Sequence, residues 1–165
     1  MPHDIYWVSG PWQAKLGIGP RPHGDDWLVD AIVRLRRDGI DAILSLLTKE
    51  EEKSLGLLHE ANVAETNGMV FISHPIPDLH VPASRRQFST VLNTIDAHLS
   101  SGRNVFIHCR QGIGRTGLVA ACLLVKNGWT PQDAIEHLTS VRGLQVPQTE
   151  EQRRWIYEYA SQPRR

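Results

Sequence analysis

Residues 104–125 of this chain read NVFIHCRQGIGRTGLVAACLLV and form a junction between a strand and a helix. The apolar run at 104–108 predicts a strand, and the glycines between Cys109 and Gly117 predict a tight loop. Residues 118–125 predict a helix. Because that helix is apolar on every side, we expect it to lie buried in the middle of the fold.

Strands and helices alternate on both sides of this junction. Short apolar runs predict strands at residues 5–8, 16–18, 40–47 and 69–72. The helical spacing of apolar residues predicts helices over residues 27–35, 55–61 and 88–99, and two more that begin after Thr130 and Thr149. This alternation predicts an α/β fold with a central, mostly parallel sheet and helices on both faces. Such sheets bind ligands at the C-terminal ends of their strands.

The predicted helices carry capping signals at their starts. We expect Asp25 or Asp26 to cap the first long helix. Thr130 stands directly before a proline at the first helical position, and Thr149 forms a capping box with Gln152.

The composition limits the classes of function. Eighteen Lys and Arg balance eighteen Asp and Glu among 165 residues, so no positive field attracts polyanions and we expect no nucleic-acid partner. Two cysteines exclude a disulfide scaffold, and no pattern of His, Cys and carboxylates suggests a metal or another cofactor. The longest apolar run is too short to span a membrane, and we expect no secretory signal. A cytoplasmic monomer with no membrane contact and one domain is therefore expected.

The loop after the strand admits two interpretations. Residues 112–117 match the glycine pattern G-x-G-x-x-G of dinucleotide-binding sites. That pattern also requires a second strand after the helix, with an acidic residue at its end to hold the ribose. A second helix follows here instead, so this interpretation is disfavoured. The Gly-Lys-Ser/Thr of a nucleotide-binding P-loop is missing as well.

The second interpretation is a thiol nucleophile at one end of a phosphate-binding loop. Glycines let the backbone between Cys109 and Arg115 curl, so that its N–H groups surround an anion. The guanidinium of Arg115 binds phosphoryl oxygens in bidentate fashion, and the same donors favour the thiolate of Cys109. The predicted phosphate-binding residues are Arg110, Gln111, Gly112, Ile113, Gly114 and Arg115.

Three further residues complete the predicted chemistry. Thr116 can place its hydroxyl near the sulfur of Cys109 and stabilise it as a leaving group. His108 points away from the pocket by strand alternation, so we expect it to support the loop through hydrogen bonds. Asp78 follows Pro77 in a proline-rich loop, where it can act as general acid and later as general base.

These residues resemble the active site of the cysteine-dependent protein tyrosine and dual-specificity phosphatases. The signature loop of that family is H-C-x-x-G-x-x-R-S/T, and residues 108–116 fill every fixed position. Residues 76–82 resemble the mobile acid loop of the family, W-P-D-x-G-V-P, with departures at Ile76 and His80. Residues 148–152 are similar to its glutamine segment.

The resemblance spans roughly residues 40–160 and looks most like the kinase-associated phosphatase type. It implies one phosphatase domain over residues 1–165, with a catalytic core at about 25–160. The implied activity is that of a protein tyrosine phosphatase, with dual specificity as an extension, acting on a phosphorylated protein or peptide through a cysteinyl-phosphate. The implied supporting residues are His108, Gln148 and Gln152. Gln152 also completes a capping box, which leaves its catalytic role open.

Two alternatives stay open. A phosphatase of phosphoinositides or of RNA 5′-phosphates can use the same loop, and Arg110 fits the basic residues of lipid phosphatases, whereas Gln111 and Ile113 do not. A non-catalytic phosphoprotein-binding module usually lacks the nucleophile, the arginine or the acid, and all three are present here. Outside the loop we expect Cys122 to be an inert core residue, and we expect solvated surface charges at Arg85, Arg86 and Arg142.

Overall fold

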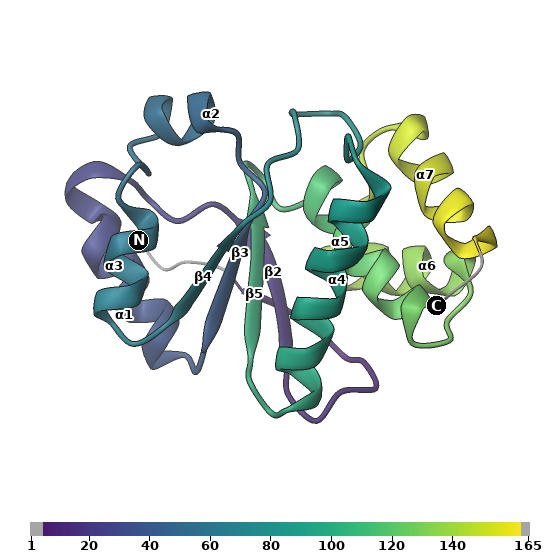
Figure 1. The fold of residues 1–165 in the computed structure, drawn as a ribbon, viewed down its shortest axis with the longest axis horizontal. Coiled ribbons are helices and arrows are strands. Elements are labelled where there is room, and N and C mark those ends of the chain that lie inside the picture. Colours follow the sequence, from purple (N-terminus) through teal and green to yellow (C-terminus); the bar gives the residue numbers. More distant parts are fainter. Residues whose placement is uncertain (1–4, 163–165) are drawn as a thin grey trace.

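The computed structural model describes residues 5–162, which form a five-stranded sheet with helices on both faces (Figure 1). The strand order is β1-β2-β5-β3-β4. The strands are β1 (Tyr6–Val8), β2 (Leu16–Pro20), β3 (Ala42–Ser45), β4 (Val70–Ser73) and β5 (Val105–Cys109). Strand β1 is antiparallel to β2, and the other pairs are parallel. The predicted α/β fold with a mostly parallel sheet is confirmed.

The helices divide between the two faces of the sheet. Figure 1 shows α1 (Leu28–Arg37) and α3 (Glu60–Thr66) on one side. The other side carries α4 (Arg85–Ser100), α5 (Gly114–Lys126), α6 (Pro131–Arg142) and α7 (Glu150–Ser161). A 3₁₀ turn, η1 (Asp25–Trp27), precedes α1, and α2 (Lys49–Ser54) lies beyond one end of the sheet.

Alternate side chains of the central strand enter two separate hydrophobic clusters. Val105 and Ile107 of β5 pack into the cluster formed with α4, α5, α6 and α7, whereas Phe106 packs into the cluster formed with α1 and α3. This period of two is expected for a strand that is covered on both faces. Helix α5 is buried throughout residues Gly114–Val125, as its uniformly apolar sequence predicted.

The segment after β3 differs from its prediction. We expected a polar stretch at 48–53 and a helix at 55–61, whereas the structure has helix α2 in the first range and starts α3 near the end of the second. Helix α2 is too polar for an apolar periodicity to mark it. It begins instead with a capping box, in which the Glu51 N–H donates to Thr48 Oγ1 at 3.3 Å and the Thr48 N–H donates to the Glu51 carboxylate at 3.1 Å.

The predicted capping by Asp25 or Asp26 is wrong. Gly24 stands at the N-cap of η1, and no side chain caps η1 or α1. Asp25 has a positive φ of 53° and its N–H donates to the Gly56 carbonyl at 2.9 Å. Asp25 thus fastens the start of this helical segment to the turn between α2 and α3.

The caps predicted at Thr130 and Thr149 are confirmed. Thr130 Oγ1 accepts from the Asp133 N–H at 3.1 Å, and Thr149 Oγ1 accepts from the Gln152 N–H at 3.1 Å. These caps fix the starts of α6 and α7, which both pack on α5. Within residues 5–162, none of the helices combines the length and the apolar character needed to cross a membrane.

One edge of the sheet collects the loops that matter for function. Strands β2, β3, β4 and β5 run parallel, so their carboxyl ends lie together: Pro20 pairs with Cys109, and Ser45 pairs with His108 and Ser73. The loops that follow these strands therefore start from neighbouring positions. Ligand sites of open α/β sheets lie at this edge.

Candidate active site

The loop between β5 and α5 curls around the sulfur of Cys109. Cys109 is the last residue of β5 and is only 3% exposed. The Gly112 N–H donates to Cys109 Sγ at 3.3 Å. Gly112 has a φ of 74°, and its Cα lies so close to Gly19 of β2 that an added Cβ would be 2.2 Å from the Gly19 carbonyl carbon. Glycine is therefore required at position 112, both for the turn and for the close approach of the two backbones.

Arg115 lies in the first turn of α5 with its guanidinium buried. Its Nη1 and Nη2 donate to the two carboxylate oxygens of Glu51 at 2.7 and 2.9 Å. Nη1 also donates to the Ile76 carbonyl at 2.8 Å, and Nη2 donates to Asp78 Oδ1 at 3.1 Å. Burial lowers the pKa of Arg115, but the hydrogen bonds to Glu51 and the negative charges of Cys109, Glu51 and Asp78 raise it above its ordinary value.

Glu51 is a site residue that the sequence analysis missed. Its side chain is 9% exposed and also accepts from Arg110 Nε at 3.3 Å. Burial raises the pKa of Glu51, yet hydrogen bonds from Arg115 and Thr48 and the charge of Arg115 outweigh burial and lower the pKa to about 2. The capping box with Thr48 was the available signal, because it places this carboxylate at the start of a helix, but it does not reveal the partner 64 residues away.

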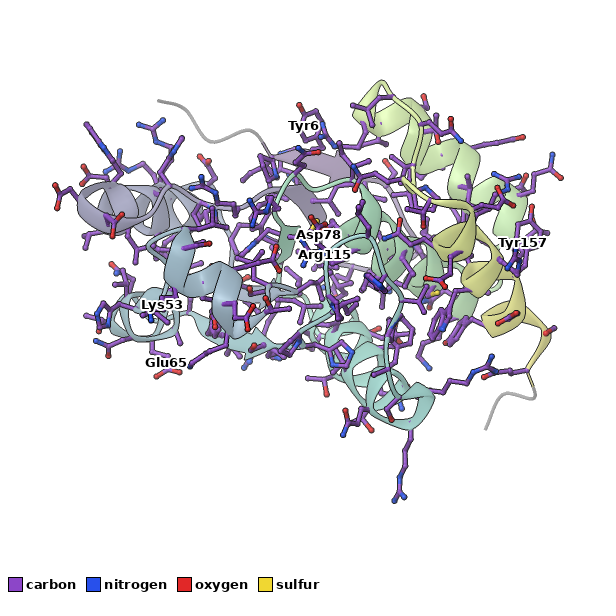
Figure 2. All side chains as sticks on the ribbon, turned by 90° about the horizontal axis from the view of Figure 1, so that it is seen from above. Tyr6, Lys53, Glu65, Asp78, Arg115 and Tyr157 are labelled. Carbon is purple, nitrogen blue, oxygen red and sulfur yellow. The ribbon has the colours of Figure 1, made fainter. Side chains whose placement is uncertain are left out.

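The acid loop after β4 brings Asp78 to Arg115. Figure 2 shows these two side chains together in the view from above, and their ion pair measures 3.1 Å. The Asp78 side chain is 49% exposed, whereas the Arg115 side chain is 1% exposed, so the ion pair joins a buried cation to a solvent-accessible carboxylate. Leu79 has a positive φ of 67°, and the His80 carbonyl accepts from Gln152 Nε2 at 3.2 Å.

His108 supports the loop from behind. Its side chain shares a face of β5 with Phe106, as strand alternation predicts, and its ring lies 6.0 Å from that of Phe106. Its Nε2 lies 2.7 Å from Glu60 Oε2, and its Nδ1 lies 3.3 Å from the Cys109 carbonyl. Both side chains of the His108–Glu60 pair are fully buried. Glu60, on α3, is a second residue that the sequence analysis missed.

Thr116 does not make the contact that its position suggested. Its hydroxyl is buried, and among the described residues it has no hydrogen-bond partner, the sulfur of Cys109 included. The glutamines do reach the loop: a Cβ on Gly114 would lie 2.6 Å from Gln148 Oε1 and 3.0 Å from Gln152 Oε1. Gln152 Oε1 also accepts from the Gln148 and Thr149 N–H groups at 3.2 Å each, so Gln152 is a helix cap that touches the pocket as well.

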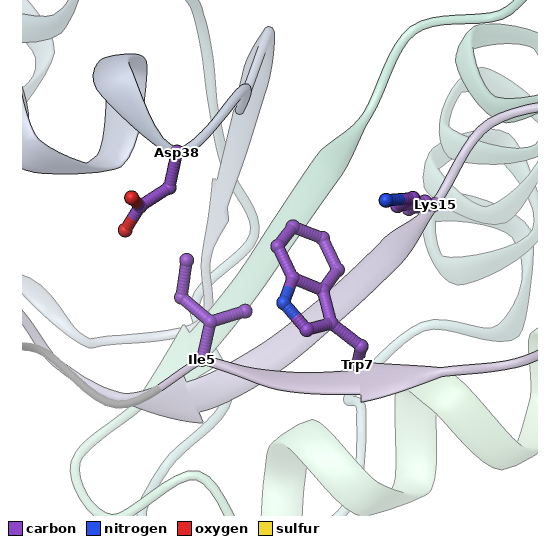
Figure 3. A pocket seen from close by; sticks show the side chains of 4 residues that line it. All are labelled: Ile5, Trp7, Lys15 and Asp38. Carbon is purple, nitrogen blue, oxygen red and sulfur yellow. The ribbon is translucent and has the colours of Figure 1, made fainter.

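The described part of the chain shows no metal site, because no three His, Cys, Asp or Glu side chains among residues 5–162 form a group that fits a metal ion. A shallow hollow of about 380 Å³ is lined by Ile5, Trp7, Lys15 and Asp38 (Figure 3). Lys15 and Asp38 precede strands β2 and β3, so this hollow lies at the amino ends of those strands, away from Cys109.

A family model described as a DSP-PTPase phosphatase of polymorphic toxin systems matches residues 20–129. The chain belongs to this dual-specificity phosphatase family. Cyclin-dependent kinase inhibitor 3 of Rattus norvegicus is 32% identical over 127 residues, which cover 76% of the chain. The putative tyrosine phosphatase 067L of Invertebrate iridescent virus 3 is 37% identical over 81 residues, 47% of the chain and 31% of the viral protein.

A solved structure of kinase associated phosphatase, with its catalytic-site cysteine substituted by serine, superposes with a TM-score of 0.89. It is 25% identical, and the match covers 96% of this chain and 94% of that one. The predicted resemblance to dual-specificity phosphatases of the kinase-associated type is confirmed. The chain spans 59% of the length of the rat relative.

We expect Glu51→Gln to destabilise the protein by roughly 3 kcal/mol at pH 7, because it leaves Arg115 buried without its carboxylate. Since the folded-state pKa of Glu51 is about 2 against an ordinary value of 4.5, its contribution is complete above pH 4.5 and fades as the pH falls towards 2. Urea unfolding of wild type and variant between pH 7 and pH 3 measures this difference. Glu50→Gln, on the exposed side of the same helix, is the control. A difference that stays constant with pH would contradict the assignment.

Proposed function

We propose that this protein hydrolyses phosphate monoesters of phosphorylated proteins or peptides through a cysteinyl-phosphate on Cys109. The proposal takes phosphotyrosine as the main substrate and phosphoserine and phosphothreonine as further ones. One observation carries it: the junction of β5 and α5, which holds Cys109 and Arg115, and the acid loop, which holds Asp78, meet at the guanidinium of Arg115. Arg115 connects to Asp78 at 3.1 Å, and the loop N–H of Gly112 points at Cys109 Sγ from 3.3 Å.

In the proposed first step, the Cys109 thiolate attacks phosphorus and the bond to the leaving oxygen breaks. Asp78 donates its proton to that oxygen, while Arg115 and the loop N–H groups hold the equatorial oxygens. In the second step, Asp78 as a carboxylate takes a proton from water. The water oxygen bonds to phosphorus, the S–P bond breaks, and phosphate leaves with Cys109 again a thiolate.

Thr116 and the glutamines take part in the second step of this proposal. The Thr116 hydroxyl is buried without a partner, so a small rotation that lets it donate to the departing sulfur costs no existing hydrogen bond. Gln148 and Gln152 lie against Gly114, and we assign to their amides the orientation of the attacking water. His108 contributes by holding the Cys109 carbonyl rather than by proton transfer.

The rim of the pocket favours a protein substrate over a polyanionic lipid or RNA. Arg110 is the basic residue of the loop, and its Nε donates to Glu51 at 3.3 Å. The negative charge of Glu51 thus partly neutralises Arg110, which would otherwise attract the second phosphate group of a polyanionic lipid or RNA. The name of the relative, kinase associated phosphatase, agrees with a phosphoprotein as substrate. We further propose that residues 1–165 act as one phosphatase domain, as a monomer.

Hydrolysis of para-nitrophenyl phosphate in EDTA between pH 5 and 8 tests the mechanism. We expect no turnover for Cys109→Ser, a loss of about 10³-fold for Arg115→Ala and a loss of about 10²-fold for Asp78→Ala. Cys122→Ala is the matched control, because burial raises the pKa of that thiol well above its ordinary value and keeps it neutral. Turnover that survives Cys109→Ser would sink the proposal, and tight phosphopeptide binding without turnover would make the protein a binding module.

Side-by-side turnover of four substrates tests the substrate class. These are a phosphotyrosine peptide, a phosphoserine peptide, a phosphoinositide in detergent and a 5′-phosphorylated RNA. We expect kcat/KM to be highest for the phosphotyrosine peptide. Higher values for the lipid or the RNA would overturn the proposed substrate while leaving the mechanism in place.

Gln152→Glu separates the two contacts of this side chain. A glutamate keeps the capping box, because its carboxylate accepts the same backbone N–H groups, but it cannot donate to the His80 carbonyl. We expect kcat/KM to fall about fivefold for phenyl phosphate, whose poor leaving group needs Asp78, and less for para-nitrophenyl phosphate. An equal fall for both substrates would show that Gln152 does not act through the acid loop.

A further inference from the structure

Three consecutive carbonyls of the phosphate-binding loop are held from outside the pocket. The Arg110 carbonyl accepts from the Arg21 N–H at 3.3 Å. The Gln111 carbonyl accepts from Arg142 Nη2 at 3.2 Å, and the Gly112 carbonyl accepts from Arg142 Nε at 3.1 Å. The donors come from the loop after β2 and from the last residue of α6, so two distant parts of the chain meet at this loop.

These contacts determine where the loop N–H groups point. In a trans peptide the carbonyl and the following N–H lie in one plane and point in opposite directions. Carbonyls of residues 110–112 that are drawn outward therefore turn the N–H groups of residues 111–113 inward. The Gly112 N–H donates to Cys109 Sγ at 3.3 Å while the Gln111 carbonyl of the same peptide is bound to Arg142.

Arg142 is in turn held by an aromatic ring. Its guanidinium carbon lies 4.0 Å from the centre of the Tyr6 ring, which fits a stacked cation–π contact. Tyr6 belongs to β1, and Figure 2 labels it above Asp78 and Arg115 in that view. Arg142 was expected to be a solvated surface charge. That expectation is wrong, because the side chain is half-buried and makes two hydrogen bonds and a ring contact.

We propose that Arg142, stacked on Tyr6, is a positioning residue that aims the amides of the phosphate-binding loop at the substrate phosphate. The proposal rests on the phosphatase function proposed above. The planar guanidinium of Arg142 can donate to two successive carbonyls at once, whereas the ammonium of a lysine is a single point charge. Tyr6 and Arg142 both lie outside residues 20–129, the range that the family model matches.

The proposal makes the N-terminal hairpin part of the catalytic unit. Strand β1 supplies the ring under Arg142, and β2 supplies Gly19, against which the backbone of Gly112 packs. The N–H of Arg21, directly after β2, holds the first of the three carbonyls. On this proposal the catalytic unit begins before residue 25, where the sequence analysis expected the catalytic core to start.

The affinity for inorganic phosphate, measured in a Cys109→Ser background where no turnover occurs, tests the positioning role of Arg142 and Tyr6. We expect Arg142→Met to raise the Kd for phosphate about 10-fold or more, and Arg142→Lys to recover only part of the loss. Tyr6→Leu is expected to raise the Kd about threefold, while Tyr6→Phe keeps the wild-type value because the ring face is retained. Arg153→Met is the matched control, since Arg153 also lies over a tyrosine, Tyr157 at 5.7 Å, without touching the loop.

Thermal unfolding of each variant shows whether a loss of binding follows from a loss of fold. If Arg142→Met fails to fold, the comparison of Tyr6→Leu with Tyr6→Phe decides alone. Folded Arg142→Met and Tyr6→Leu variants that bind phosphate as tightly as the Arg153→Met control would overturn the positioning role of Arg142. Phosphate binding that Arg142→Met weakens, in a protein whose wild type hydrolyses no ester, would overturn the proposed function and leave the positioning role of Arg142 in place.

Discussion

The rest of the site depends on the buried ion pair between Arg115 and Glu51. A guanidinium that is 1% exposed needs a bound counter-charge, because an unpaired ion in that place costs several kcal/mol. Glu51 supplies it in bidentate form at 2.7 and 2.9 Å. The same cation also binds the Ile76 carbonyl and Asp78. One side chain therefore connects α2, the acid loop and α5, and in the proposed function the substrate phosphate binds a guanidinium that Glu51 has already oriented.

The phosphate-binding loop is fixed from several directions at once. From behind, the buried His108–Glu60 pair reaches the Cys109 carbonyl. From outside, Arg142 holds two carbonyls of the loop. One oxygen of this pair, Glu60 Oε1, is buried and has no hydrogen-bond partner among the described residues. The loop is thus held from the His108 side and from the Arg142 side at the same time.

The elements that could be predicted from the sequence are those with a strong local pattern. The signature loop, the buried helix after it, the mostly parallel sheet and the caps at Thr130 and Thr149 all follow from residues close together in the chain. The partners of the buried charged side chains do not follow from such local patterns. Glu51 lies 64 residues from Arg115 and Glu60 lies 48 residues from His108, so only the packing of the fold brings them together. Helix α2 escaped prediction because its residues are polar and its only signal is a capping box.

The same contacts hold the two loops of this site unequally. The nucleophile loop is bound along its length and continues into a helix with a fully buried face. The acid loop carries a half-exposed Asp78, and Arg115 holds it through the Ile76 carbonyl and Asp78 while Gln152 holds the His80 carbonyl. Displacing the acid loop leaves the bidentate ion pair between Arg115 and Glu51 intact, whereas displacing the nucleophile loop from α2 breaks that buried pair. Displacing the nucleophile loop therefore costs more free energy than displacing the acid loop.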